Sequence, residues 1–278
     1  MKILKTIAEV KEFIHLNEMP SGFVPTMGAL HEGHLTLVRK AKRENPLCTV
    51  SIFVNPIQFN DPEDFKKYPR HFEQDLEMLE KAGCDLVFLP TTEEMYPEPD
   101  NREYLFGSLE KVMEGLHRPG HFRGVAVVVR RLFEIMEPKR AYFGEKDFQQ
   151  LMIVKKMVEL LKMPIDIIPC EIVREADGLA MSSRNTRLDG DARKAAPVIF
   201  RTLNALKEMK NNLQPEELTE WATDLINATP PLEVEYIEIA DSQSLQPIKI
   251  WNQSSAPRVF AAVWADNVRL IDNIELFY

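Results

Sequence analysis

The chain has 278 residues, and its 34 Lys and Arg against 43 Asp and Glu give a formal net charge of −9, which argues against a nucleic-acid binder because such proteins normally present a basic face. Its densest apolar runs, such as Val125 to Val129, are far shorter than the roughly 20 residues that cross a bilayer, so no membrane span is expected. Three widely spaced cysteines without a Cys-x-x-Cys pair argue against a disulfide framework or structural zinc and favour a reducing, cytoplasmic location.

Short apolar runs alternate with helical patterns from the N-terminus to Ile168. An amphipathic opening with Ile3, Ile7, Val10 and Ile14 near helical spacing comes first. Strands are then expected at 22–24, 50–54, 86–89, 141–143 and 165–168, and helices at 35–43, 72–81, 125–136 and 148–161. Because parallel strands need crossover helices and are buried on both faces, this order predicts a Rossmann-like, doubly wound parallel α/β sheet.

The pattern changes past about residue 175. Residues 186–229 are charged and helical, and strands are expected at 234–239 and 258–263. Helices followed by strands predict a small α+β domain. We therefore expect a Rossmann-like domain over 1–174 and a smaller C-terminal α+β domain over 175–278.

The loop Pro25 to His34 follows the first clear strand and leads into a helix, where open α/β sheets bind their ligands. Gly28 and Gly33 would let backbone amides approach a phosphate closely. His31 and His34 are three residues apart and can share a helix face, from which they would donate hydrogen bonds to charge developing on a phosphate. The alternatives are two unrelated surface histidines, or a zinc pair, whose usual i, i+4 spacing is missing.

Two further loops follow predicted strands. In the loop 55–60, amide side chains can hydrogen-bond a small polar substrate, although an amide that caps its own turn is the alternative. In the loop 144–150, Asp147 suits a helix N-cap and Lys146 can hold a phosphate oxygen, unless that lysine is simply solvated.

The segment Val173 to Asn185 combines Gly178, two adjacent hydroxyls and Arg184, which have the donors to wrap a triphosphate. A mobile lid is expected here, with a polar interdomain linker as the alternative. The segment 115–124 adds His117, Arg118, His121 and Arg123. Histidines and arginines gathered in a few loops of an acidic chain favour a local anionic site, whereas the competing metal cluster lacks a carboxylate at ligand spacing.

Several of these strings resemble a known family. His31-Glu32-Gly33-His34 resembles the His-x-Gly-His signature of the nucleotidyltransferase superfamily, and 181–185 resembles its Lys-Met-Ser-Lys-Ser loop. Together with FVNPIQF at 53–59, RPGHFRGV at 118–125, FGEKDFQQL at 143–151 and READGLAMSSRN at 174–185, the chain resembles the pantoate–β-alanine ligase family. Residues 269–273 resemble the family's C-terminal strand, while 264–268 lack the Gly-Lys-Thr common in relatives.

The resemblance implies a two-step reaction. Pantoate attacks the α-phosphate of Mg-ATP to give pantoyl adenylate and pyrophosphate, and β-alanine then attacks the adenylate to give pantothenate and AMP. It also implies that the first domain binds nucleotide and pantoate, that the second acts as a lid, and that the chain forms a homodimer. No protein-held metal site and no nucleic-acid partner are expected.

The resemblance also implies individual roles. His34 matches the proton donor of the family and His31 its phosphate-binding partner, with Lys146 as a third catalytic group. Because a carboxylate nucleophile carries no proton to remove, we expect His34 to act mainly by hydrogen bonding to phosphate. The expected ATP-binding residues are Met27, Gly28, Ala29, Leu30, His31, Glu32, Gly33, His34, Gly144, Glu145, Lys146, Asp147, Val173, Met181, Ser182, Ser183 and Arg184. The expected substrate-binding residues are Gln58, Gln150, Asn55, Tyr68, Arg118 and His121.

Two rival functions stay open at this point. Another adenylyltransferase would use the same phosphate loops on a different acceptor, and the pair Gln58 and Gln150 argues for a small hydroxy acid instead. A non-catalytic nucleotide-binding domain would release no pyrophosphate.

Overall fold

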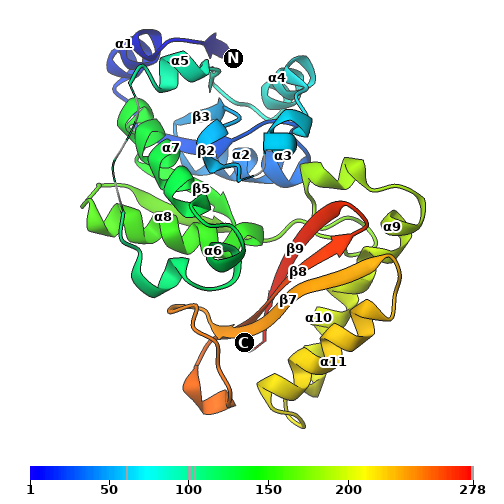
Figure 1. Ribbon diagram of the computed structural model, residues 1–278. Helices are drawn as coiled ribbons and strands as arrows, with labels where there is room; N and C mark the ends of the chain where they lie inside the picture. The colour runs from blue at the N-terminus through cyan, green and yellow to red at the C-terminus, as the bar shows by residue number, and fades with distance from the viewer. Residues whose placement is uncertain (61, 99, 101, 103, 277–278) are drawn as a thin grey trace. The chain divides into compact units, whose positions relative to one another are not determined.

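The computed structural model describes residues 1–60, 62–98, 100, 102 and 104–276, which form two compact units (Figure 1). The first unit comprises Met1–Glu110, Glu114–Glu145 and Gln150–Glu171. The second comprises Lys111–Met113, Lys146–Gln149 and the chain from Ile172 onward. The short segment around Lys146 therefore belongs with the C-terminal part of the chain, although it follows a strand of the first unit.

The first unit contains a parallel sheet of six described strands with helices between them. The strands are β1 (Lys2–Leu4), β2 (Ser21–Thr26), β3 (Leu47–Ile52), β4 (Leu86–Phe88), β5 (Arg140–Gly144) and β6 (Asp166–Cys170). The helices are α1 (Ile7–Asn17), α2 (Glu32–Glu44), α3 (Pro62–Lys67), α4 (Phe72–Lys81), α5 (Thr92–Met95), α6 (Met113–His117), α7 (His121–Met136) and α8 (Phe148–Leu160), of which α6 and α8 begin in second-unit segments. Short 3₁₀ turns lie at η1 (Pro56–Gln58), η2 (Gly107–Glu110) and η3 (Glu145–Asp147).

The doubly wound parallel sheet expected from the sequence is confirmed. Its strand order is β1-β4-β3-β2-β5-β6, and every pairing is parallel. The chain moves from β2 outward to β3 and β4, then returns to the other side of β2 for β5 and β6. This reversal is a topological switch point, where open α/β sheets bind ligands. Because β3, β2 and β5 are neighbouring parallel strands, the loops that follow them all begin at the same edge of the sheet.

Successive residues of a strand point to opposite faces of the sheet. In this sheet both faces are covered by helices, as two neighbouring residues of β2 show. Phe23 of β2 packs edge-on against Phe133 of α7, with ring centroids 6.3 Å apart. Its neighbour Val24 lies in the opposite cluster with Leu35 and Val38 of α2. The helix expected over 125–136 is confirmed as α7.

The N-terminal expectation was partly wrong. Ile3 lies in β1, which pairs with β4 in parallel, and not on the first helix. The helix α1 begins after Thr6, whose side chain accepts from the Glu9 amide while the Glu9 carboxylate accepts from the Thr6 amide. This capping box makes the helix begin at Ile7. Ile3 instead adopts a strand conformation, because it pairs with Val87 of β4.

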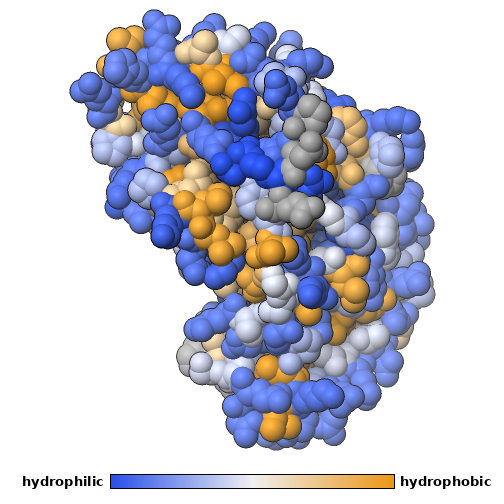
Figure 2. All heavy atoms as spheres, turned by 60° about the vertical axis from the view of Figure 1, so that its left-hand side comes forward, coloured by the Kyte–Doolittle hydropathy of each residue, from blue (hydrophilic) through white to orange (hydrophobic). Residues whose placement is uncertain are grey.

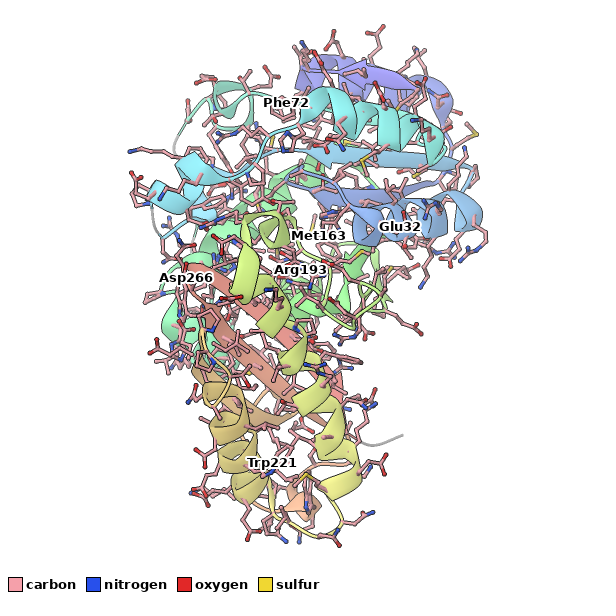
Figure 3. All side chains as sticks on the ribbon, turned by 90° about the vertical axis from the view of Figure 1, so that its right-hand side faces the viewer. Glu32, Phe72, Met163, Arg193, Trp221 and Asp266 are labelled. Carbon is pink, nitrogen blue, oxygen red and sulfur yellow. The ribbon has the colours of Figure 1, made fainter. Side chains whose placement is uncertain are left out.

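The second unit has an antiparallel sheet of three strands, β7 (Leu232–Asp241), β8 (Pro257–Ala265) and β9 (Val268–Glu275), in the order β7-β8-β9. The helices α10 (Pro197–Met209) and α11 (Pro215–Asn227) bury apolar residues against it, and α9 (Gly190–Ala195) precedes them. Figure 3 shows Arg193 on α9 and Trp221 on α11. Short 3₁₀ turns lie at η4 (Ser183–Arg187) and η5 (Trp251–Gln253).

The segment 264–268, which lacks the Gly-Lys-Thr that the resemblance leads us to expect, contains the β8–β9 turn. Ala265 pairs with Val268, and Asp266 adopts a φ of 54°. Asp and Asn tolerate this left-handed conformation better than most residues. Asp266 and Asn267 are exposed at this hairpin turn, whereas Ala265 and Val268 on either side are buried.

The surface in Figure 2 is mainly hydrophilic, with its apolar residues in separate groups. Within the part of the chain that the structure describes, no helix is both long and apolar enough to cross a membrane.

Candidate active site

The loop after β2 has a backbone that only certain residues accept. Gly28 has a φ of 85° and Ala29 a φ of 48°. A Cβ at Gly28 would lie 2.9 Å from Ile52 Cγ2 and 3.0 Å from Asp75 Oδ2. Glycine is therefore required at position 28 by both conformation and space.

A carboxylate of α4 accepts hydrogen bonds from the backbone of this loop. Asp75 is 1% exposed, and its two oxygens accept the amides of Ala29 at 3.0 Å and Leu30 at 2.7 Å. Burial raises the pKa of Asp75, and the two amide hydrogen bonds oppose that rise. These two amides are therefore directed at Asp75. Sequence reasoning missed this residue, although a carboxylate on the buried stripe of α4, four residues before buried Leu79, was a usable signal.

The two histidines of the signature meet at the start of α2. His31 is the N-cap residue, and its ring centroid lies 4.0 Å from that of His34. The amide of His31 donates to Nδ1 of His34 at 3.3 Å. An accepting Nδ1 leaves the proton of neutral His34 on Nε2, where it can be donated. The shared face expected from the spacing is thus present at a helix N-terminus, which favours anions.

Glu32 at the first position of α2 does not direct its carboxylate to the histidines. Arg39 forms an ion pair with it, and this contact lowers the pKa of Glu32 (Figure 3 labels Glu32). The expected contact of Glu32 with ATP would therefore have to come from its backbone.

The polar residues of the loop after β3 form a connected group with the loop after β2. Gln58 Nε2 donates to Met27 Sδ at 2.8 Å, and Gln58 Oε1 accepts from Asn55 Nδ2 at 3.2 Å. Fully buried Asn55 also accepts from the Tyr96 hydroxyl at 2.9 Å and donates to Gly124 O at 3.2 Å. Tyr96, which directly follows α5, is a further member of this group that sequence reasoning missed, because its contact with Asn55 spans 41 residues of the chain.

The start of α7 contacts the same group. His121 Nδ1 lies 2.9 Å from the carbonyl oxygen of Gln58, and His121 Nε2 lies 3.3 Å from an Arg118 nitrogen. A Cβ at Gly124 would lie 2.6 Å from Ile57 O, so only glycine lets η1 pack here. Tyr68 contacts the loop after β2, with its hydroxyl 3.5 Å from Gly28 O.

Four other candidate residues of the first unit lie outside this hydrogen-bonded group. Gly144 ends β5, Glu145 opens η3 and Gln150 lies in the first turn of α8. Arg123 donates to the backbone carbonyls of Asp100 and Arg102, so it ties a loop and does not join His121.

The second unit holds the other expected phosphate-binding residues. Lys146 and Asp147 lie in η3. Val173 and Met181 face each other in a hairpin, with the Met181 amide 3.0 Å from Val173 O. The hairpin turns at Gly178, whose φ is 94° and whose Cβ, if present, would lie 2.3 Å from a Phe200 ring carbon.

The hairpin leads into a capped 3₁₀ turn. Ser182 is the N-cap of η4, and its hydroxyl accepts from the Arg184 amide at 3.2 Å. Arg193 pairs with Glu175 and Asp177, each at 2.6 Å (Figure 3 labels Arg193). Burial is the largest single effect and would raise the pKa of Asp177, but the hydrogen bonds from Arg193 and the Leu179 amide, together with the Arg193 charge, lower it overall. The segment expected to be a lid is therefore tied firmly to its own unit.

No group of three His, Cys, Asp or Glu side chains with metal-binding geometry occurs among the described residues. A magnesium ion that keeps several waters and binds phosphate oxygens needs no such cage.

The architecture and the site define a class. A parallel sheet with a His-x-Gly-His helix start at its switch point has the features of a nucleotidyltransferase-type, nucleotide-binding α/β protein. The sequence profile of the pantoate-β-alanine ligase family matches residues 2–275, and the chain belongs to that family.

Known proteins similar to the chain support this family assignment. The pantothenate synthetase of Porphyromonas gingivalis is 49% identical and that of Bacteroides fragilis 46%, each over 99% of both chains. The crystal structure of pantothenate synthetase from Thermus thermophilus matches with a TM-score of 0.93 and 43% identity over all of both chains. A pantoate-β-alanine ligase from Francisella tularensis, solved with β-γ ATP and β-alanine, matches with a TM-score of 0.84 and 36% identity over 99% of this chain and 98% of that one.

Proposed function

We propose that the chain condenses pantoate with β-alanine at the expense of ATP, giving pantothenate, AMP and pyrophosphate through a pantoyl adenylate. One observation carries the proposal. The histidine pair at the start of α2 lies at the switch point, and the hydrogen-bonded group of Met27, Asn55 and Gln58 occupies the same sheet edge. A phosphate-binding helix start next to neutral amide side chains suits a nucleotide and a small polar acceptor.

In the first step a pantoate carboxylate oxygen forms a bond to the α-phosphorus, and the bond from that phosphorus to pyrophosphate breaks. Negative charge must be offset while two anions approach. His31 and His34 would donate hydrogen bonds to the reacting phosphate. Lys146 and the residues 182–184 would bind the remaining phosphate oxygens.

In the second step the β-alanine nitrogen attacks the acyl carbon, the C–N bond forms, and the bond to AMP breaks while the amine loses its proton. AMP is a good leaving group, so holding the amine close to the carbonyl matters more than strong acid or base help. Gln58, Asn55, Tyr68, Arg118 and His121 would line this acceptor region, together with Gln150.

Mg²⁺ would enter as the Mg-ATP complex and offset phosphate charge during the first step. We further propose that the chain works as a homodimer in the cytoplasm. The three unpaired, buried cysteines Cys48, Cys84 and Cys170 suit a reducing compartment.

Half-reaction assays test the function. With ATP, Mg²⁺ and pantoate alone, purified protein should release pyrophosphate, and AMP with pantothenate should accumulate only after β-alanine is added. A reaction without pantoate is the control. Folded protein that releases no pyrophosphate on addition of pantoate would contradict the proposal, and pyrophosphate release with a nucleotide acceptor instead would favour the rival adenylyltransferase.

A further inference from the structure

Strand β9 carries two adjacent buried polar residues that the reaction scheme leaves without a role. Asp272 is 5% exposed and Asn273 is 2% exposed. We propose that they position the two ATP-facing segments of the second unit, Asn273 the segment around Lys146 and Asp272 the hairpin 173–181. The inference rests on the proposed function, because it deepens the role of the phosphate site.

Asn273 holds the backbone of Lys146. Its Nδ2 donates to the carbonyl oxygen of Lys146 at 3.0 Å, and its Oδ1 accepts from Arg258 Nη1 at 2.6 Å. A guanidinium only donates and a carbonyl only accepts, so the amide has one satisfactory orientation. The donor of Asn273 is thereby directed at Lys146.

Arg258 strengthens the same attachment. It is 6% exposed, and its guanidinium lies 4.0 Å from the ring centroid of Phe148, two residues after Lys146. A stacked cation of this kind is stabilising when it is shielded from water. The segment is therefore held both at the Lys146 carbonyl and at the Phe148 ring.

Asp272 holds the hairpin. Its carboxylate binds Arg174 through two hydrogen bonds, at 2.6 Å to Nη1 and 2.9 Å to Nη2. Arg174 Nη1 also donates to Gly178 O at 3.1 Å, and its guanidinium stacks on Phe200 at 4.0 Å. The turn that precedes Met181 to Arg184 is thus fixed by one carboxylate.

The adjacency of the two residues has a geometric reason. Successive side chains of a strand point to opposite faces, so neighbouring positions of β9 reach different segments. Asn273 does not contact the phosphate in this scheme. It fixes the main chain from which Lys146 extends, and is a positioning residue.

Asn273→Asp tests the first attachment selectively. The carboxylate still accepts from Arg258 but places an oxygen against the Lys146 carbonyl. We expect kcat for pantoate-dependent pyrophosphate release to fall about 10- to 100-fold, as a displaced catalytic group would produce. The reaction of synthetic pantoyl adenylate with β-alanine should stay unchanged. Asn267→Asp is the matched control, because it makes the same chemical change at the exposed β8–β9 turn.

A double-mutant cycle separates positioning from general damage. If Asn273 acts through Lys146, Asn273→Asp should change the activity of Lys146→Ala protein by less than about twofold. Equal losses in both backgrounds, or an Asn273→Asp protein as active as Asn267→Asp, would overturn the inference. A Lys146→Ala protein as active as wild type would overturn it too. Wild-type protein without pantoate-dependent pyrophosphate release would instead contradict the proposed function.

Asp272→Asn tests the second attachment. One charge-assisted hydrogen bond to Arg174 is lost, so the KM for ATP should rise about tenfold while the KM for pantoate is unchanged. Parallel increases in both constants would show general disruption and count against a role at the ATP site.

Discussion

The carboxylate of Asp75 accepts the amide of Leu30 at 2.7 Å, although 45 residues separate the two in the chain. The same carboxylate takes the amide of Ala29, where the backbone has a positive φ. A negative charge thus fixes the loop that leads to the histidine pair, for which we propose a polyanionic substrate. The loop can tolerate this charge because its two amides satisfy both carboxylate oxygens.

Asp75→Asn should loosen the loop. An amide group cannot accept both backbone N–H groups, so one of them loses its partner in a buried place. We expect a loss of about 1–3 kcal/mol in the free energy of unfolding, measured by urea denaturation. We also expect pantoate-dependent pyrophosphate release to slow at least tenfold, because His31 and His34 follow the loop directly.

Glu77→Gln on the same helix is the control for Asp75, because Glu77 is exposed and the change also removes one negative charge. It should leave stability and activity unchanged. An Asp75→Asn protein with the stability and rate of this control would show that the amide contacts are unimportant.

Lys146→Ala should slow adenylation by about two to three orders of magnitude, because a charge that stabilises the transition state is removed. Lys155→Ala on α8 serves as the control for loss of a lysine. The measurement is single-turnover pyrophosphate release, which isolates the first step. Unchanged turnover would remove Lys146 from the mechanism.

The sequence predicted the parallel sheet and the order of its elements because buried strands and crossover helices leave strong periodic patterns. It also located the histidine pair, because His31 and His34 are only three residues apart at the start of one helix. Asp75 and Asn273 escaped prediction because their roles depend on tertiary contacts, over 127 residues in the case of Asn273 and Lys146. Ile3 was misplaced for a similar reason, since its strand partner Val87 is remote in the sequence.

Gly178→Ala should destabilise the second unit strongly. The new Cβ would lie 2.3 Å from the Phe200 ring at a φ of 94°, so backbone strain and overlap add. We expect a loss of about 2–4 kcal/mol in unfolding free energy. Gly107→Ala isolates the backbone effect, because Gly107 has a φ of 64° and open space around it, and it should cost about 1 kcal/mol. Equal losses for the two variants would show that the Phe200 contact relaxes freely.

Tyr142 should make stability fall at alkaline pH. Burial, followed by its hydrogen bond to Glu44, raises the pKa of this fully buried phenol to about 12, with a bond from Asn45 opposing. The folded state thus retains a proton that the unfolded chain loses near pH 10, so the stabilising contribution is complete below about pH 10 and is lost as the pH rises toward 12.

Urea unfolding of wild type and Tyr142→Phe at pH 9 to 12 checks this dependence. The phenylalanine variant should be less stable at pH 9, because it loses the Glu44 and Asn45 contacts, yet its stability should fall less steeply between pH 10 and 12. Other titrating groups are common to both proteins, so the difference between the two curves reports Tyr142. Parallel curves would mean that the phenol titrates alike in the folded and unfolded states, and that its burial in the core next to Asn45 does not hold its proton.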